Sequence, residues 1–276
     1  MSLPTHLASL LPALEDLARK AGMAIMEVYA TDFSVYTKTD SSPVTAADER
    51  AEAIILPGLE ALTPGIPVVA EEAAAAGNIP EVGTGPFWLV DPLDGTKEFV
   101  KRNGEFTVNI GLIVNGIPSV GVVLAPAQNI LWSGALGAGA FRVDESGERR
   151  EIRCRDLPAS GAVVLTSRSH RDPEQLAQWM NDYPDAILDF AGSSLKFCRL
   201  AEGVADLYPR FGPTSEWDTA AASAVLMAAG GVVNCLEGRP LAYAKPKFRN
   251  SGFIARGSAQ TANAGVFCWT VTSGRE

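Results

Sequence analysis

A hydrophobic run that ends in two carboxylates constrains this chain more than any other feature of its sequence. Residues 87–91 read as a buried β-strand, which leads into Asp91, Asp94 and a Gly95-Thr96 turn. Aspartates at the end of a buried strand cost free energy unless a cation meets them. A hard divalent cation such as Mg²⁺ prefers oxygen ligands, and the free backbone N–H groups of such a turn suit a phosphate. The stretch therefore predicts metal-dependent phosphoryl chemistry.

The composition is that of a globular enzyme and excludes several other classes of protein. Of the 276 residues, 47% are hydrophobic and 20% are charged, which is enough for a large core. The net charge of −9 does not suit a nucleic acid polymer as partner. No signal peptide is recognisable, and no apolar run approaches the roughly 20 residues of a transmembrane segment.

The cysteines and histidines narrow the choice of compartment and metal. The four cysteines are far apart and form no metal-binding motif, so we expect reduced thiols in a cytoplasmic protein. The two histidines, His6 and His170, cannot make a histidine-rich zinc site. The ligands of a bound metal would be mainly oxygens, which favours Mg²⁺ or Mn²⁺ over Zn²⁺.

Strands and helices are mixed throughout the chain, which predicts an α/β or α+β layered protein. The spacing of apolar residues predicts helices over 7–30 and 45–62, the second with Thr45 as N-cap. Asn115-Gly116 predicts a hairpin between strands 106–114 and 117–124. Further strands are expected over 66–70, 130–133, 139–143, 162–167, 186–190 and 205–208, further helices over 173–181, 193–202 and 216–229, and loops or turns over 73–86 and 144–151.

Acidic residues occur at four places where a core element begins or ends. Asp91 and Asp94 follow one strand, Glu71-Glu72 follows another, and Asp48 and Asp218 lie in or near the first turn of a helix. Each position alone is more often structural, because acids near helix starts complement the helix dipole and Asp-Gly turns are common. Together they indicate a metal cage.

Two other motifs fit the acids less well, and a third is absent from the sequence. An EF-hand loop needs acids at alternating positions and a late Glu, which Asp91 and Asp94 do not provide. Phosphatases of the haloacid dehalogenase type use Asp-x-Asp-Gly-Thr, and this chain has one residue more between the acids. The sequence holds no P-loop consensus, so we do not expect an ATPase.

Three segments resemble the signatures of the inositol monophosphatase superfamily of Mg²⁺-dependent, Li⁺-sensitive phosphatases. These are Glu71-Glu72, Asp91-Pro-Leu-Asp-Gly-Thr96 and Trp217-Asp-Thr-Ala-Ala221. The longer string from Asp91 to Ile110 and Gly192-Ser-Ser-Leu-Lys-Phe197 resemble the CysQ-type 3'(2'),5'-bisphosphate nucleotidases in particular. The resemblance spans about residues 40 to 255. It implies a layered α/β/α/β/α sandwich, with the active site between an N-terminal half, 1–155, and a C-terminal half, 156–276.

The resemblance also implies a role for each matched residue. Two Mg²⁺ ions, or three if a weaker site is filled, would be held by Glu71, Asp91, Asp94, Asp218 and the carbonyl of Leu93. The catalytic residues would be Glu71, Asp48 and Thr96, the last two by activating the attacking water. The substrate would contact Glu71, Leu93, Asp94, Gly95, Thr96, His170, Ser193, Lys196, Arg210 and Asp218.

By resemblance, the substrate is 3'-phosphoadenosine 5'-phosphate, cleaved to AMP and phosphate, which links the protein to sulfate assimilation. Its phosphosulfate relative is also a candidate substrate. The rival enzyme is an inositol monophosphatase or another sugar-phosphate phosphatase, and the rival of another class is an inactive regulatory protein on the same fold. Both a monomer and a homodimer fit the resemblance. Relatives of this type can associate peripherally with the inner bacterial membrane, and nothing in this sequence shows it.

The chain departs from the family pattern at three places. Ala222 stands where Gly is usual, and Ser223 where nucleotidases often have His. Lys247-Phe248-Arg249 is more basic than the pattern. These departures bear on nucleoside preference rather than on phosphatase chemistry. Among the cations, Lys101 and Arg102 fit a solvated loop, whereas Lys196 fits an exposed helix face and a ligand site equally well.

Overall fold

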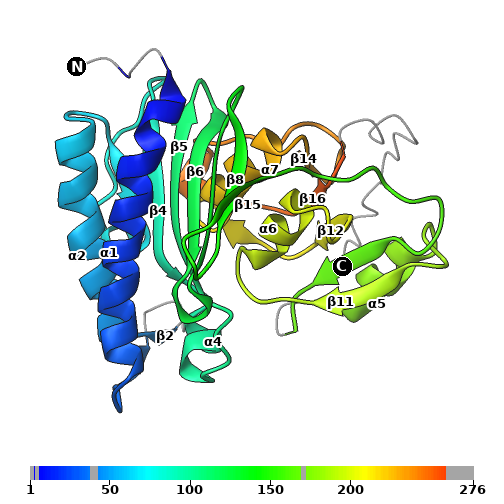
Figure 1. Ribbon diagram of the computed structural model, residues 1–276, viewed down its shortest axis with the longest axis horizontal. Helices are drawn as coiled ribbons and strands as arrows, with labels where there is room; N and C mark the ends of the chain where they lie inside the picture. The colour runs from blue at the N-terminus through cyan, green and yellow to red at the C-terminus, as the bar shows by residue number, and fades with distance from the viewer. Residues whose placement is uncertain (1–2, 4–5, 38–42, 169–171, 259–276) are drawn as a thin grey trace, which may run out of the picture.

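Helices and sheets alternate in five layers, which confirms the α/β/α/β/α sandwich (Figure 1). The computed structural model describes residues 3, 6–37, 43–168 and 172–258. The larger sheet has the strand order β3-β4-β5-β6-β7-β8-β9, and the smaller has β11-β10-β12-β16-β14. The larger sheet consists of β3 (Val68–Ala70), β4 (Phe87–Asp94), β5 (Thr107–Val114), β6 (Ile117–Ala125), β7 (Ile130–Ala135), β8 (Gly139–Val143) and β9 (Arg149–Ile152). The smaller consists of β10 (Val163–Thr166), β11 (Ile187–Phe190), β12 (Leu207–Arg210), β14 (Val232–Cys235) and β16 (Phe253–Arg256).

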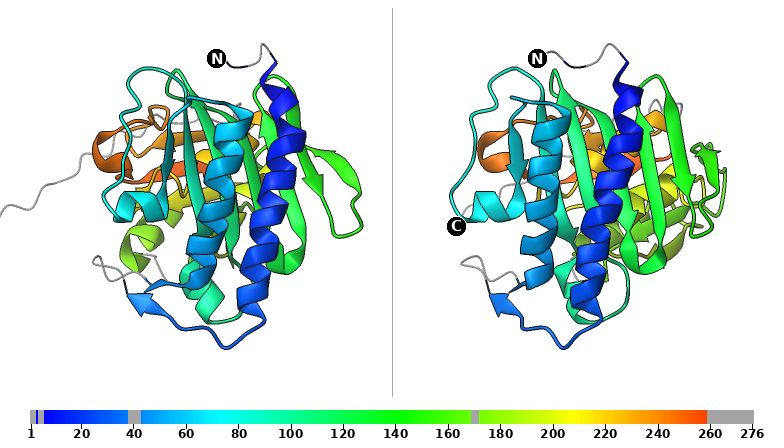
Figure 2. Two further views of the ribbon diagram at one scale, coloured as in Figure 1. Left: turned by 90° about the vertical axis from the view of Figure 1, so that its left-hand side faces the viewer. Right: turned by 60° about the vertical axis from the view of Figure 1, so that its left-hand side comes forward.

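The first helix layer consists of α1 (Leu11–Tyr29) and α2 (Ala46–Leu62), which lie side by side on the larger sheet (Figure 2). α1 is amphipathic, and its apolar side chains are buried together with Trp88 and Val90 of β4. α2 begins at the predicted cap, because the Thr45 hydroxyl accepts a 3.1 Å hydrogen bond from the N–H of Ala47. The two helices thereby cover one face of the sheet and leave the other face to the middle layer.

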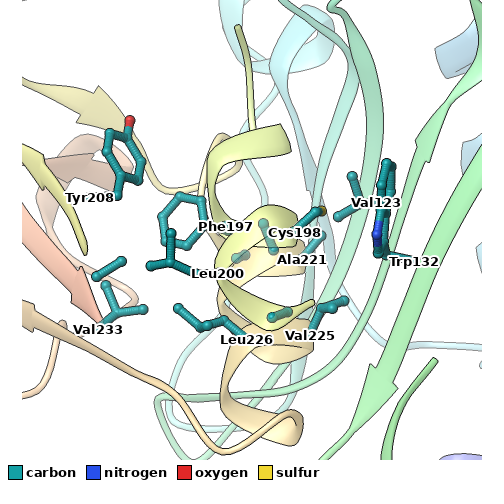
Figure 3. Close-up of a cluster of buried hydrophobic side chains, with 14 of the residues drawn as sticks. Val123, Trp132, Phe197, Cys198, Leu200, Tyr208, Ala221, Val225, Leu226 and Val233 are labelled. Atoms are coloured by element: carbon teal, nitrogen blue, oxygen red, sulfur yellow. The ribbon is translucent and has the colours of Figure 1, made fainter. Parts of the chain in front are cut away.

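The middle layer consists of α6 (Leu195–Ala201) and α7 (Ala220–Ala228), which lie between the two sheets. Figure 3 shows this core: Phe197 and Leu200 of α6 lie toward Tyr208 and Val233 of the smaller sheet, and Trp132 lies on the larger sheet beyond Cys198. Since α6 and α7 pack on both sheets, the two halves share one core.

Glycines in the larger sheet let α7 approach the strands closely. A Cβ added to Gly121 of β6 would lie 2.0 Å from the carbonyl oxygen of Ala221, and one added to Gly111 of β5 would lie 2.6 Å from the backbone nitrogen of Ala221. Both contacts are to backbone atoms, which cannot move aside as a side chain can. The small residues therefore set the position of α7, and with it that of Asp218 just before the helix.

The outer helix α5 (Pro173–Met180) covers the second face of the smaller sheet. Side chains of a strand alternate between faces: Leu165 of β10 belongs to the middle core, whereas its neighbour Val164 packs with Trp179 of α5. This alternation accounts for the fifth layer.

Shorter elements complete the described chain, and several of them differ from the sequence-based expectation. The first three residues of the expected loop 73–86 instead belong to a short helix, α3 (Glu71–Ala75), and the expected turn 144–151 contains the start of strand β9. The expected helix 216–229 begins only at Ala220. The remaining elements are η1 (Leu7–Leu10), β1 (Tyr36–Thr37), β2 (Pro43–Val44), α4 (Thr96–Val100), η2 (Pro126–Gln128), β13 (Thr214–Ser215), η3 (Pro246–Phe248) and β15 (Arg249–Asn250).

The larger sheet ends with β9 and the smaller begins with β10, on either side of residues 155 and 156. The division into two halves at that point stays a prediction, because α6 and α7 from the second half share a core with the first. Among the helices that the structure describes, none combines the length and the apolar character needed to cross a membrane.

Candidate active site

A bulge at the end of β4 turns two aspartates toward one site. Asp91 pairs with Asn109 and Asp94 pairs with Thr107, so Pro92 and Leu93 lie opposite a single residue of β5. In a regular strand, residues three apart point to opposite faces, and a bulge changes that direction. Asp91, Leu93 and Asp94 consequently line the same cavity.

The start of α2 brings Asp48 to the Gly95-Thr96 turn. Asp48 is buried, and its Oδ2 accepts two hydrogen bonds of 2.8 Å, from the backbone N–H and the hydroxyl of Thr45. Its Oδ1 lies 3.4 Å from Oγ1 of Thr96. The capping box of α2 therefore fixes one carboxylate oxygen and directs the other at Thr96, which is the pairing that the resemblance implies.

Helix α3 positions Glu71, and Glu52 supports that helix. The backbone N–H groups of Glu72 and Ala73 donate hydrogen bonds of 2.9 Å to the two oxygens of the Glu52 carboxylate. A helix start leaves such N–H groups without helical partners, so a carboxylate of α2 satisfies them. Glu71, the first residue of α3, is half-buried at the site.

Asp218 completes the acids from the other half of the chain. It lies in the turn before α7, where its Oδ2 accepts a 2.8 Å hydrogen bond from the N–H of Ser215. Ser215 belongs to β13, which pairs with β15. The small two-stranded sheet thus holds the turn that carries Asp218.

The acids lie where two cavities adjoin. Glu71, Asp94 and Asp218 line both the first cavity, of about 330 Å³, and the second, of about 480 Å³; we call these three residues the acid wall. Gly95 and Thr96 also line both cavities. Asp91 lines the second cavity only.

Charge repulsion among these acids suits a cation. Burial raises the pKa of Asp91 well above its ordinary value, and repulsion from Glu71, Asp94 and Asp218 raises it further. Burial likewise raises the pKa of Asp218 and Asp94, although the Ser193 hydroxyl and Lys196 partly oppose this at Asp94. Buried carboxylates in mutual repulsion are the donor set that a hard divalent cation stabilises. The residues present therefore fit Mg²⁺.

The carboxylates accept hydrogen bonds from neighbouring backbone and hydroxyl groups. In the described ranges, no three His, Cys, Asp or Glu side chains stand together in an arrangement that would itself hold a metal ion. Asp91 accepts a 3.0 Å hydrogen bond from the N–H of Leu93, and Asp94 and Asp218 are bonded to Ser193 and Ser215. Binding a cation requires these side chains to converge, and the assignment of Glu71, Asp91, Leu93, Asp94 and Asp218 as ligands stays a prediction.

The turn before α6 reaches from the second half of the chain to Asp94. Ser193 has a backbone φ of 51°, a conformation that is uncommon outside glycine. Its hydroxyl donates a 2.6 Å hydrogen bond to Asp94 and lies 2.5 Å from the hydroxyl of Thr107. The Thr107 hydroxyl also lies 2.8 Å from that of Ser194. A chain of hydroxyl groups thus connects the two halves at the acid wall.

Lys196 and Arg210 line the first cavity, as do Lys97 and Arg249. Lys196 is only 3% exposed, so an exposed helix face is the wrong description of it. Its ammonium donates to the carbonyls of Ala191 at 3.1 Å and Ser193 at 2.6 Å. Burial lowers its pKa to about 8, and Asp94 opposes that shift. Arg210 lines the same cavity and donates to the carbonyl of Gly212 at 3.3 Å.

The other cations named from the sequence have different positions. Lys97 lines the first cavity. Arg102 donates two 2.6 Å hydrogen bonds to the carbonyls of Tyr29 and Thr31, which gives it a structural role. Lys101 is exposed and does not line either cavity. His170 lies outside the described residues.

Sequence reasoning missed three residues that support the site, Glu52, Glu105 and Thr107. Glu105 accepts a 2.9 Å hydrogen bond from the N–H of Gly192 and forms an ion pair with Arg168, so it fixes the turn that carries Ser193. A Cβ on Gly192 would lie 2.7 Å from the Glu105 carbonyl oxygen, so the contact is also sterically tight. Glu105 and Thr107 could have been found from the sequence, because both lie in the string from Asp91 to Ile110 that resembles the nucleotidases.

The fold and site define a class of layered α/β proteins that hold a carboxylate-rich site between two sheets. The model of the inositol monophosphatase family matches residues 6–267. This chain belongs to the inositol monophosphatase family.

Within that family, the similar proteins include nucleotidases. The chain is 51% identical over 240 residues to the 3'(2'),5'-bisphosphate nucleotidase CysQ of Escherichia coli O157:H7, covering 86% of this chain and 95% of the relative. The crystal structure of CysQ from Bacteroides thetaiotaomicron superposes with a TM-score of 0.76 at 36% identity, covering 90% of this chain and 97% of the other. The inositol monophosphatase of Anabaena sp. PCC 7120 superposes with a TM-score of 0.74 at 28% identity and covers 94% of both chains.

Proposed function

We propose that this protein is a Mg²⁺-dependent phosphatase that removes the 3'-phosphate of 3'-phosphoadenosine 5'-phosphate, giving AMP and inorganic phosphate. The observation that carries the proposal is that the acid wall lines the first cavity together with Lys196 and Arg210. A substrate with a second phosphate needs such cations. The similarity to the CysQ nucleotidases over most of both chains supports the same choice.

The carboxylates of Glu71, Asp91, Asp94 and Asp218, with the carbonyl of Leu93, would hold Mg²⁺ in two sites, with a third, weaker site toward Asp48. When bound, the metal supplies a hydroxide near neutral pH and stabilises the charge that develops on the phosphoryl oxygens. The proposal needs no covalent intermediate.

Asp48 and Thr96 take up the proton of the attacking water. Oδ2 of Asp48 is occupied by Thr45, so Oδ1, 3.4 Å from the Thr96 hydroxyl, is the oxygen that can receive a proton through that hydroxyl. The backbone N–H groups of Gly95 and Thr96 bind the scissile phosphate, because the start of α4 leaves them without helical partners. The positive φ of Gly95, 94°, produces the turn that presents them.

The first cavity binds the rest of the nucleotide. Lys196 and Arg210 pair with the second phosphate, and the side chains of Phe197 and Tyr208 contribute apolar surface for the nucleoside. Ser193 and His170 are assigned to the same substrate. The 5'-phosphosulfate relative of the substrate presents similar charges and is a second candidate.

The proposal places the enzyme in the cytoplasm, with a role in sulfate assimilation, and no part of it depends on a membrane. The proposed site is compatible with a monomer and with a homodimer.

Substrate profiling tests the proposal. We expect Mg²⁺-dependent release of phosphate from 3'-phosphoadenosine 5'-phosphate to exceed that from inositol 1-phosphate and fructose 1,6-bisphosphate. Lys196→Met and Arg210→Leu should raise the KM for the nucleotide about tenfold or more, the effect of one lost charge-assisted hydrogen bond. Lys101→Met, which removes an exposed charge, is the control. Preference for inositol 1-phosphate would overturn the substrate, and activity on none of the three would favour the regulatory rival.

A further inference from the structure

The second cavity carries two cations that the proposed function leaves without a role. Lys247 and Arg249 line it together with Ala74 and Ala75 of α3; Lys247 lines the second cavity and not the first, whereas Arg249 lines both. Both belong to the segment that is more basic than the family pattern. Both side chains are exposed to solvent on a protein whose net charge is −9. The second cavity is therefore acidic at the acid wall and basic at its outer rim.

A buried carboxylate fixes the backbone of the loop that carries these cations. Glu216 is fully buried and accepts hydrogen bonds of 2.8 Å and 2.9 Å from the N–H groups of Ala244 and Lys245. Its own N–H donates a 2.8 Å hydrogen bond to the carbonyl of Phe248. Since Glu216 lies two residues before Asp218, its hydrogen bonds connect this loop to the turn that carries Asp218.

The loop also holds an unfavourable backbone conformation. Ala244, Lys247 and Phe248 have φ values of 67°, 58° and 50°, and such conformations of non-glycine residues cost free energy that the surroundings must offset. Phe248 is buried and packs edge-on against Phe87, with ring centroids 6.2 Å apart. The fixed backbone thus places Lys247 and Arg249 at the rim.

These cations are available to a ligand. In the described part of the chain, the Lys247 ammonium forms no hydrogen bond and no ion pair, and the Arg249 guanidinium donates one hydrogen bond, 3.1 Å, to the Ser215 hydroxyl. The cations that lower the pKa of the acid wall are others: Lys196 acts on Asp94, and Arg210 acts on Asp218. Neither Lys247 nor Arg249 is among the groups that shift the pKa of Asp94 or Asp218.

The geometry of phosphoryl transfer indicates which ligand Lys247 and Arg249 bind. In an in-line displacement the attacking and leaving oxygens lie on opposite sides of phosphorus. The second cavity shares the acid wall with the first, in which the nucleotide is proposed to bind. We propose that the second cavity lies on the side of the attacking water and is the exit path of the released phosphate dianion, and that Lys247 and Arg249 form an anion subsite at its mouth. The inference rests on the proposed function, which supplies both the phosphate and the direction of attack.

Product inhibition tests the subsite. For the Mg²⁺-loaded enzyme, the inhibition constant of inorganic phosphate should rise about tenfold in Lys247→Gln and further in the double variant with Arg249→Gln, as expected for lost charge-assisted hydrogen bonds. AMP is proposed to occupy the first cavity. In Lys247→Gln, the change in its inhibition constant should be at least threefold smaller than the change for inorganic phosphate. Lys101→Gln and Arg239→Gln are charge-matched controls, because Lys101 is exposed and the Arg239 side chain is 80% exposed beside Glu237.

Two outcomes would overturn the subsite. One is an unchanged inhibition constant of phosphate in the double variant. The other is an equal change for phosphate and AMP in Lys247→Gln, which would assign the cations to the nucleotide. Calorimetric titration of the Mg²⁺-loaded protein with inorganic phosphate gives a second readout that requires no turnover. If the wild type hydrolyses no nucleotide but phosphate binds more weakly to Lys247→Gln than to the wild type, the proposed function fails and the anion subsite stands.

Discussion

The Ser193 hydroxyl donates a 2.6 Å hydrogen bond to Asp94, and this bond joins the two halves of the protein at the acid wall. The donor precedes α6 and the acceptor ends β4, 99 positions apart in the chain. The bond favours the ionised form of Asp94, whose pKa burial raises. A carboxylate that is proposed to bind Mg²⁺ therefore depends on a side chain from the other half.

Ser193→Ala should weaken Mg²⁺ activation. Loss of a partner that hydrogen-bonds a metal ligand costs about 10- to 100-fold in metal affinity or activity. We expect the Mg²⁺ concentration for half-maximal phosphate release to rise by that factor. Ser146→Ala is the matched control, because Ser146 donates a 2.6 Å bond to Asp144 in an exposed turn that lines neither cavity. Equal Mg²⁺ activation of wild type and Ser193→Ala would refute the dependence.

Asp91→Asn should stabilise the metal-free protein, and increasingly so as the pH rises. The pKa of Asp91 is raised in the folded state above its ordinary value of 3.8. Its contribution to stability is therefore fully present below about pH 4 and is lost as the pH rises through the raised value. The loss is about 1.4 kcal/mol for each unit of pKa shift.

Urea denaturation in EDTA between pH 4 and 8 measures this effect. The free energy of unfolding of Asp91→Asn should exceed that of wild type by an amount that grows with pH, and Mg²⁺ should stabilise wild type far more than the variant. A difference that is independent of pH would contradict the burial and repulsion described for Asp91.

Nucleotide hydrolysis should weaken above pH 8. Burial lowers the pKa of Lys196 to about 8, so this side chain loses the charge that is proposed to pair with the second phosphate as the pH rises further. The value of kcat/KM reports ionisations of the free enzyme. It should fall between pH 8 and 9.5 in wild type, while in Lys196→Met it should be low and flat over that range. A fall of the same shape in both proteins would assign the ionisation to another group.

Gly121→Ala should unfold or strongly destabilise the protein. The new methyl group would lie 2.0 Å from the Ala221 carbonyl oxygen, and overpacking of this kind costs about 3 kcal/mol or more when backbone must move. Gly85→Ala is the control, because a Cβ there meets nothing within 4 Å and the backbone φ is not positive. Thermal unfolding of both variants measures the difference, and equal midpoints would show that α7 can shift away from the sheet.

Much of the site could be predicted because its residues lie within short strings. Asp91, Asp94 and Thr96 follow one strand, and the Thr45 cap with Asp48 follows from the pattern of one helix start. The link from Ser193 to Asp94 could not be derived from local patterns, since only the tertiary fold brings α6 to the end of β4.

The errors in secondary structure also have physical causes. The Ala-rich run after Glu71 is too short to show helical periodicity, and helix α3 depends on the Glu52 carboxylate 20 positions earlier. β9 is an edge strand whose first three residues, from Arg149 to Glu151, are exposed. It therefore lacks the apolar alternation that identifies a strand. The contact made by Ser223 could not be predicted from the sequence either: its hydroxyl accepts a 3.1 Å hydrogen bond from the hydroxyl of Tyr243, 20 positions later.

The most direct test of the account compares wild type with Asp91→Asn in phosphate release from 3'-phosphoadenosine 5'-phosphate, over a range of Mg²⁺ concentrations. Asp91 is 1% exposed at the end of β4, and Asn keeps its size while it removes the charge. The account predicts Mg²⁺-dependent turnover in wild type and loss of turnover by at least about a thousandfold, some 4 kcal/mol of transition-state stabilisation, in a variant that remains folded. Equal turnover of the two proteins would contradict the assignment of the acids as the catalytic centre.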